Sequence, residues 1–134
     1  MNWQAPVSRR ALFRVAIGGG LTLALHGVTG GWLRQWLIAA RLRQLLPHDL
    51  GAIAIGAAYL LQRPMEADPG RLVGELLTSL PHRTVAPDLM DRPGLEGLVR
   101  DGIRADFQTG RTVVLHGWIV SVTEARLAAL VIVA

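Results

Sequence analysis

Apolar and polar residues alternate at helical spacing over most of the chain that follows residue 31. Leucine, valine, isoleucine and alanine recur every three to four residues, and prolines separate the first four stretches from one another. Residues 81–93 contain three prolines and no regular pattern, which predicts a loop. The pattern predicts five helices, at residues 32–46, 50–61, 69–80, 94–108 and 125–133.

The same spacing indicates which side of each helix faces the core. In 32–46 the apolar side carries Leu33, Trp36 and Leu37, so we expect an ordinary core-facing helix. Because this segment has arginines and tryptophans but no acid, a helix lying on a membrane surface is the alternative. Segment 50–61 is apolar on all sides and rich in small residues, which predicts a central buried helix, with a protein–protein contact as the alternative.

Capping residues mark the ends of these helices. Asp49 and Asp68 are suitable N-caps, and Gly110 is a natural C-terminal stop. Ser121 and Glu124 have the spacing of a capping box, in which each side chain bonds the other residue's backbone amide. In 94–108 the residues expected to face inward are Leu95, Leu98, Val99, Ile103 and Phe107.

The chain changes character before its last helix. Residues 112–115 are rich in β-branched side chains, which predicts an extended segment, and His116-Gly117 can form a turn. The predicted fold is therefore a single small, mainly α domain over 32–134. It has four to five helices and one short extended segment before the C-terminal helix.

The N-terminus has the pattern of an export signal. Residues 8–14 read Ser-Arg-Arg-Ala-Leu-Phe-Arg, and a glycine-rich apolar run follows at 15–25. This resembles the twin-arginine (Tat) signal, although the Leu-Phe order is the reverse of the commonest pattern. The resemblance implies recognition by the Tat translocase and export of folded protein to the periplasm or cell envelope. The residues that match the motif are Ser8, Arg9, Arg10, Leu12, Phe13 and Arg14.

The fate of this signal segment, residues 1–31, has two predicted outcomes. It is either cleaved or retained as an inner-membrane anchor, since small residues occur at 27–31 but no clean Ala-x-Ala site is present. A transmembrane helix over 15–33 is a further alternative, which six glycines and an internal His26 disfavour.

Composition excludes several kinds of chemistry. The 134 residues include no cysteine, which excludes disulfides, thiolate metal sites, iron–sulfur clusters and a cysteine nucleophile. All fourteen cationic side chains are arginines, and three of them lie in the signal segment. The rest of the chain is nearly neutral, so the charge does not predict nucleic-acid binding.

Candidate catalytic and metal-binding residues are few. His116 and Ser121, with Glu124 or Asp106, could form a hydrolytic triad, but the capping box already uses Ser121 and Glu124. A metal site could draw on three scattered histidines with nearby aspartates, but their spacing matches no ligand pattern. We therefore predict no catalytic, cofactor or metal residues. The residues considered for metal were His48, His82 and His116, with Asp49, Asp88 and Asp91.

The C-terminal stretch resembles the end of small Tat-exported bacterial proteins that have no established activity. The matching residues are Asp106-Phe107, Gly117-Trp118, Ser121 and Thr123 to Leu127. With the signal, this predicts a non-catalytic accessory or assembly subunit of a larger exported enzyme, typically an oxidoreductase. A membrane-tethered envelope protein and a small hydrolase or metal-dependent enzyme are the alternatives. The residues expected to contact a partner are Trp32, Trp36 and Trp118.

Overall fold

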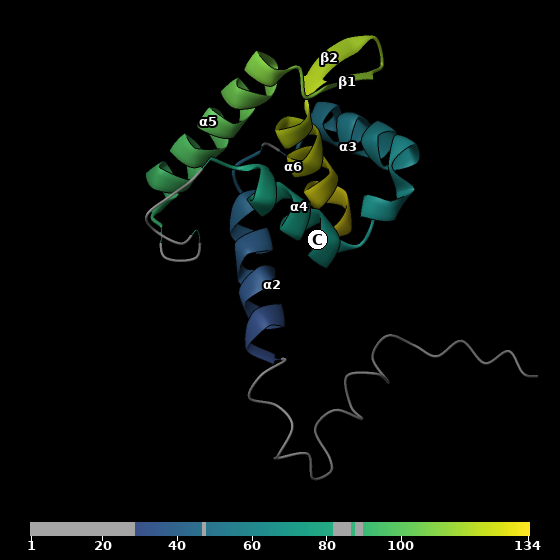
Figure 1. Cartoon of the computed structure of the whole chain (residues 1–134). Coiled ribbons are helices and arrows are strands. Elements are labelled where there is room, and N and C mark those ends of the chain that lie inside the picture. The colour runs from purple at the N-terminus through teal and green to yellow at the C-terminus, as the bar shows by residue number, and fades with distance from the viewer. Residues whose placement is uncertain (1–28, 47, 82–86, 88–89) are drawn as a thin grey trace, which may run out of the picture. The chain divides into compact units, whose positions relative to one another are not determined.

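The computed structural model describes residues 29–46, 48–81, 87 and 90–134 (Figure 1). Within these ranges the fold is mainly helical, and a two-stranded antiparallel sheet precedes the C-terminal helix, which confirms the predicted fold class. The predicted Tat motif lies outside the described residues. The elements are α2 (Thr29–Arg43), α3 (Leu50–Gln62), a 3-10 turn η1 (Pro64–Glu66), α4 (Pro69–Ser79), α5 (Arg92–Thr109), β1 (Thr112–Leu115), β2 (Trp118–Ser121) and α6 (Val122–Val133).

Local capping chemistry fixes where most helices begin. The carboxylate of Asp49 accepts from the amide of Ala52 at 2.8 Å, and Asp68 makes the equivalent bond to Arg71 at 2.8 Å. α5 begins two residues earlier than predicted, because Asp91 is its N-cap. It ends at Gly110, whose φ of 72° is a left-handed conformation that glycine adopts without strain.

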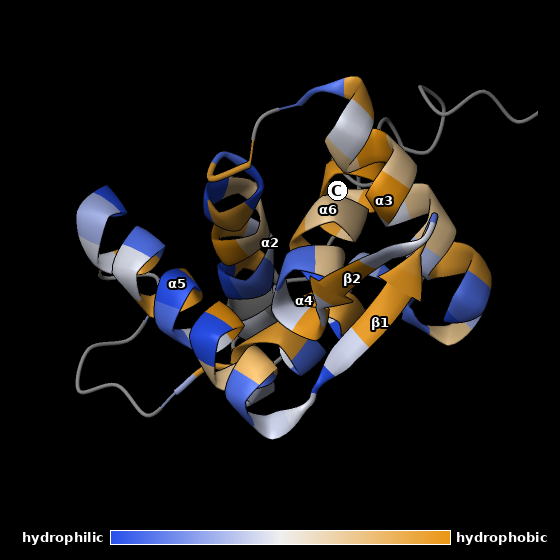
Figure 2. Ribbon diagram, turned by 90° about the horizontal axis from the view of Figure 1, so that it is seen from above, coloured by the Kyte–Doolittle hydropathy of each residue, from blue (hydrophilic) through white to orange (hydrophobic). Residues whose placement is uncertain are grey.

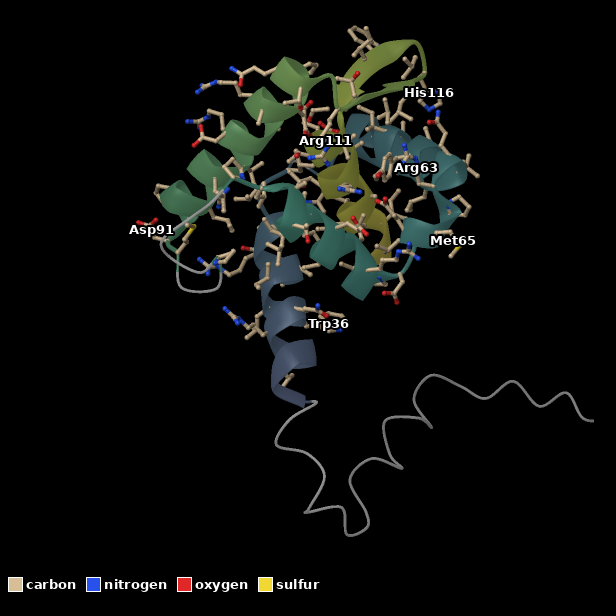
Figure 3. All side chains as sticks on the ribbon, in the orientation of Figure 1. Trp36, Arg63, Met65, Asp91, Arg111 and His116 are labelled. Carbon is tan, nitrogen blue, oxygen red and sulfur yellow. The ribbon has the colours of Figure 1, made fainter. Side chains whose placement is uncertain are left out.

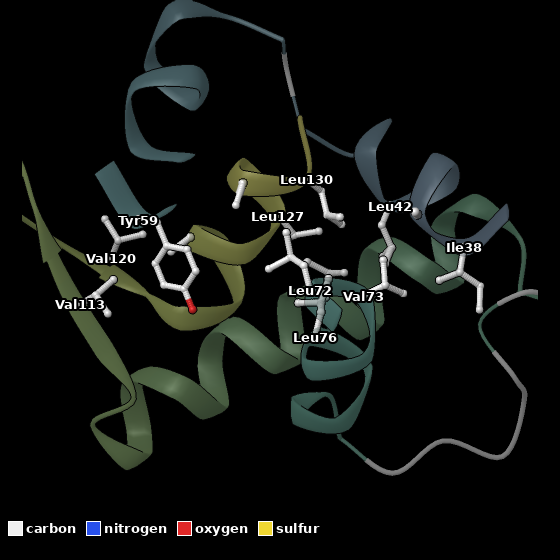
Figure 4. Packing of buried hydrophobic residues seen from close by; sticks show 14 of the residues in the cluster. Ile38, Leu42, Tyr59, Leu72, Val73, Leu76, Val113, Val120, Leu127 and Leu130 are labelled. Atoms are coloured by element: carbon white, nitrogen blue, oxygen red, sulfur yellow. The ribbon is translucent and has the colours of Figure 1, made fainter. Parts of the chain in front are cut away.

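Helix α6 lies at the centre of the described domain, and α3, α4 and α5 pack around it (Figures 1 and 4). All six residues from Ala125 to Leu130 are buried. α3 approaches α6 closely at Gly56, where a β-carbon would lie 2.4 Å from the carbonyl oxygen of Ala128. The core that surrounds α6 includes Ile38, Leu42, Tyr59, Leu72, Val73, Leu76, Leu95, Val113 and Val120.

The prediction that 50–61 forms the central buried helix is wrong. In α3 only Gly56 and Tyr59 are buried, and the opposite side of the helix is exposed. A helix that is apolar all round gives no periodic signal for its inward face, so the sequence could not separate the two sides. α6 takes the central place because it packs against α3, α4, α5 and both strands.

The inward face of α2 was also predicted wrongly. Ile38, Ala39 and Leu42 are buried, whereas Leu33, Trp36 and Leu37, the predicted core face, are exposed. α2 carries apolar residues on both sides, so the spacing of its apolar residues does not distinguish the exposed stripe from the buried one. In α5, Leu95, Leu98 and Val99 are buried as predicted and Ile103 is partly buried, but Phe107 is 51% exposed and lies on the outer side of the helix beside β2.

Candidate partner-binding surface

A tight β-hairpin presents apolar side chains to solvent. His116 and Gly117 have φ values of 51° and 79°, the two positive values that a type I′ turn requires. The turn sets a register in which Leu115 faces Trp118 and Val114 faces Ile119. Trp118 is 73% exposed, and Val114 and Ile119 are also mostly exposed.

An apolar groove adjoins this hairpin. It has a volume of about 330 Å³ and lies where the hairpin meets α3, α5 and α6. Tryptophan and phenylalanine at such a groove offer large contact areas that lose little side-chain entropy on binding. We call this surface the hairpin groove; its lining residues are Leu46, Ala52, Ile55, Phe107, Trp118, Ile119, Val120, Glu124 and Ala128.

Glu124 is the single charged residue among those that line the hairpin groove. Its carboxylate accepts from the amide of Ser121 at 3.2 Å, and its own amide donates to the hydroxyl of Ser121 at 3.0 Å. This is the capping box that the sequence predicts. The box fixes the start of α6 and holds one negative charge beside the groove.

A second carboxylate supports the same junction. Asp106 is 1% exposed and accepts from the amide of Thr123 at 2.7 Å. The guanidinium of Arg111 lies 3.3 Å from the other oxygen of this carboxylate. Asp106 therefore caps α6 from the last turns of α5, seventeen residues earlier in the chain, and fixes the hairpin against both helices. The sequence predicts Asp106 as a member of the C-terminal motif and as a possible catalytic acid, but not as this cap.

A buried ion pair connects α6 with the turn after α3. The guanidinium of Arg126 donates two hydrogen bonds to Glu66, each 2.9 Å long, in a bidentate arrangement. The hydroxyl of Tyr59 donates to the same carboxylate at 2.7 Å. Glu75 lies 3.6 Å from the guanidinium and is partly exposed. This cluster was not predicted, because Glu66 and Arg126 are sixty residues apart in the sequence.

These contacts set the protonation states of the cluster. The hydrogen bonds from Arg126 hold the pKa of Glu66 below its ordinary value and outweigh the opposing effect of burial. Burial and the hydrogen bond to Glu66 raise the pKa of Tyr59. At neutral pH the cluster is therefore an ionised pair with a protonated tyrosine. The cluster therefore ties α6 to α3 and to η1.

A second pocket, of about 350 Å³, lies between α2 and the start of α4. Trp36 and Ala39 line it on one side, and Asp68 and Val73 line it on the other. Trp36, one of the predicted contact residues, is 51% exposed at this pocket. Trp32 is a residue of α2, but its side chain lies outside the described part of the chain.

The described residues do not assemble the hydrolytic triad that the sequence allowed. Ser121 is fully buried in its cap, and His116 lies at the exposed tip of the hairpin (Figure 3). No three histidine, aspartate or glutamate side chains within the described ranges are grouped so that they could hold a metal ion. His82 and Asp88 lie outside these ranges. None of the described helices is long and apolar enough to span a bilayer.

Neither protein-family models, nor curated proteins, nor solved structures gave a match to this chain. Any conclusion about function therefore depends on the sequence signals and on the surfaces described above.

Proposed function

We propose that this protein is exported through the Tat route and acts as a non-catalytic accessory or assembly subunit of a larger exported enzyme of the oxidoreductase type. The Tat route carries folded cargo, and the residues at positions 8–14 have the pattern of its signal. Enzymes that use this route commonly travel with small subunits, and a chain with no catalytic grouping among its described residues fits that role.

The observation that carries the subunit role is the exposed hairpin groove. Contiguous exposed apolar patches on soluble proteins mark interaction sites, and tryptophan is enriched at the centres of protein interfaces. Trp118 is 73% exposed, and Phe107 and Ile119 lie beside it. Two caps fix the backbone at the start of α6 beside this surface, so a partner would bind it mainly at the cost of ordering exposed side chains.

The test is co-purification from the cell envelope of the native host. The exported protein is captured through an affinity tag, and the co-purifying proteins are identified by mass spectrometry. We expect one larger exported enzyme in a fixed ratio, and we expect Trp118→Ala to lower its recovery at least tenfold. Leu37→Ala is the matched control, because Leu37 is exposed to a similar degree but lies on α2, outside the groove.

Two results would contradict this proposal. One is the absence of any enzyme in a fixed ratio with the tagged protein. The other is equal recovery of the partner by wild type, Trp118→Ala and Leu37→Ala, which would remove the hairpin groove from the contact.

The exposed stripe of α2 favours a second candidate function, that of a membrane-tethered envelope protein. Leu33, Trp36 and Leu37 lie on this stripe, and Arg34 is exposed beside them. In this case the signal segment stays in the membrane and α2 lies at the lipid interface. Recovery of the protein only in the membrane pellet, resistant to high salt, would support this function over a soluble subunit.

A further inference from the structure

Helix α3 carries a straight exposed apolar stripe along its whole length. Leu50, Ala54, Ala57 and Leu61 follow one another at spacings of four, three and four residues, which places them on one line along a helix. Leu50 and Leu61 are each 85% exposed. No charged residue occurs in α3, and most of its ribbon has hydrophobic colours, whereas α5 is largely hydrophilic (Figure 2). We call this surface the α3 stripe.

The α3 stripe is unlike the outer surface of α5. There, ion pairs cover the side that faces solvent, such as Arg92 with Glu96 at 2.9 Å and Arg104 with Asp101 at 3.7 Å. Such charges are the usual way to keep an exposed helix soluble. α3 has none of them, so its outer side has the composition of a helix interface and not of a solvated surface.

The order of residues on the α3 stripe is the same in both directions. It reads large, small, small, large, from Leu50 through Ala54 and Ala57 to Leu61. If two copies of α3 pack antiparallel about a two-fold axis, Leu50 of each copy meets Leu61 of the other. Ala54 then meets Ala57, so that small residues lie where the helices cross and allow a close approach. A surface that matches itself in this way is what a two-fold symmetric contact requires.

The charges at the two ends of α3 favour the same arrangement. Asp49 precedes the helix and Arg63 follows it, and both residues are exposed. In an antiparallel pair, Asp49 of one copy lies beside Arg63 of the other at both ends of the contact. In a parallel pair, each charge would lie beside its like.

We propose that the α3 stripe is a self-association surface, on which a second copy of this chain packs its own α3 in antiparallel orientation. One helix side per copy is at the small end of the range for specific interfaces, so we expect a micromolar, reversible dimer. The proposal does not depend on the proposed function, because the α3 stripe and the hairpin groove use different sides of α3. Ala52 and Ile55, which line the groove, are not part of the stripe.

Sedimentation equilibrium of the purified full chain, from about 1 to 300 μM, tests the dimer. We expect a monomer–dimer equilibrium that weakens as salt is raised. Ala57→Arg places a charge at the crossing point and should weaken association on the order of 100-fold. Ala40→Arg is the matched control, because Ala40 is an exposed alanine of α2 away from the stripe, and it should leave the equilibrium unchanged.

Cross-linking tests the orientation, since the chain has no cysteine of its own. An oxidised mixture of Leu50→Cys and Leu61→Cys chains should give a disulfide-linked dimer of one chain of each kind. Either variant alone should stay mostly uncrosslinked. If two copies of the same variant form disulfides as readily as the mixed pair does, the antiparallel arrangement is overturned.

A wild-type protein that stays monomeric over the whole concentration range would overturn self-association. So would an Ala57→Arg variant that dimerises as strongly as wild type. Neither result affects recovery of the partner by the hairpin groove, so failure of this proposal can be told apart from failure of the proposed function.

Discussion

Removing the carboxylate of Glu66 should be among the most damaging single changes to the folded protein. The Arg126 side chain is only 8% exposed, and in Glu66→Ala its guanidinium loses two charge-assisted hydrogen bonds of 2.9 Å. Breaking a buried pair by removing one partner costs about 3–5 kcal/mol, because the other charge stays buried without compensation. Glu75 lies 3.6 Å away and can compensate in part, but it is 46% exposed and more solvated. We therefore expect a loss of about 3 kcal/mol.

Urea denaturation followed by circular dichroism measures this loss, and a thermal scan should show a fall in Tm of roughly 10–20 °C. The matched control replaces the whole cluster, as Tyr59→Phe with Glu66→Met and Arg126→Met. Apolar side chains of similar volume leave no buried charge, so this variant should regain most of the lost stability. A loss below about 1 kcal/mol in Glu66→Ala would refute the reasoning, since that is the range of a solvated surface pair. So would a triple variant no more stable than Glu66→Ala.

The remaining predictions also concern the stability of the folded protein, and the same denaturation measurements test them. The pKa of Glu66 in the folded protein lies below its ordinary value of 4.5, so its ionised form stabilises the fold above pH 4.5, and this stabilisation is lost as the pH falls through the folded pKa. Glu66→Gln should therefore make stability depend less on pH in this acidic range. An unchanged pH dependence in the variant would contradict this prediction. Ser121→Ala should cost about 1 kcal/mol, and an unchanged Tm would show that the cap does not hold α6. Gly56→Ala should cost about 1–3 kcal/mol of stability, because the new β-carbon would overlap the backbone of Ala128. A β-carbon at Gly97 meets nothing within 4 Å, so Gly97→Ala should be neutral or stabilising. Equal changes in stability in the two variants would contradict the close packing of α3 on α6.

The elements predicted well from sequence are those whose ends are set by neighbouring residues. Asp49, Asp68 and Gly110 act on backbone groups within a few positions, so the sequence nearby carries the whole signal. The capping box of Ser121 and Glu124 is of the same kind.

The features that sequence could not give depend on packing between distant segments. Both α2 and α3 have apolar residues on two sides, so only the volume available around α6 decides which side is buried. Asp106 lies seventeen residues before the amide that it caps, and Arg126 lies sixty residues after Glu66. Buried charges of this kind have no local pattern that distinguishes them from ordinary surface residues.

The central claim is export by the Tat route, and the signal itself offers the most direct measurement. Arg9→Lys with Arg10→Lys keeps the charge of the segment but removes both guanidinium groups, and Arg14→Lys is the control outside the pair. Immunoblots of periplasmic and cytoplasmic fractions measure the rate of export in a Tat-competent bacterium. We predict that the double variant stays in the cytoplasm while Arg14→Lys is exported like wild type. Export of the double variant at the wild-type rate would contradict the account.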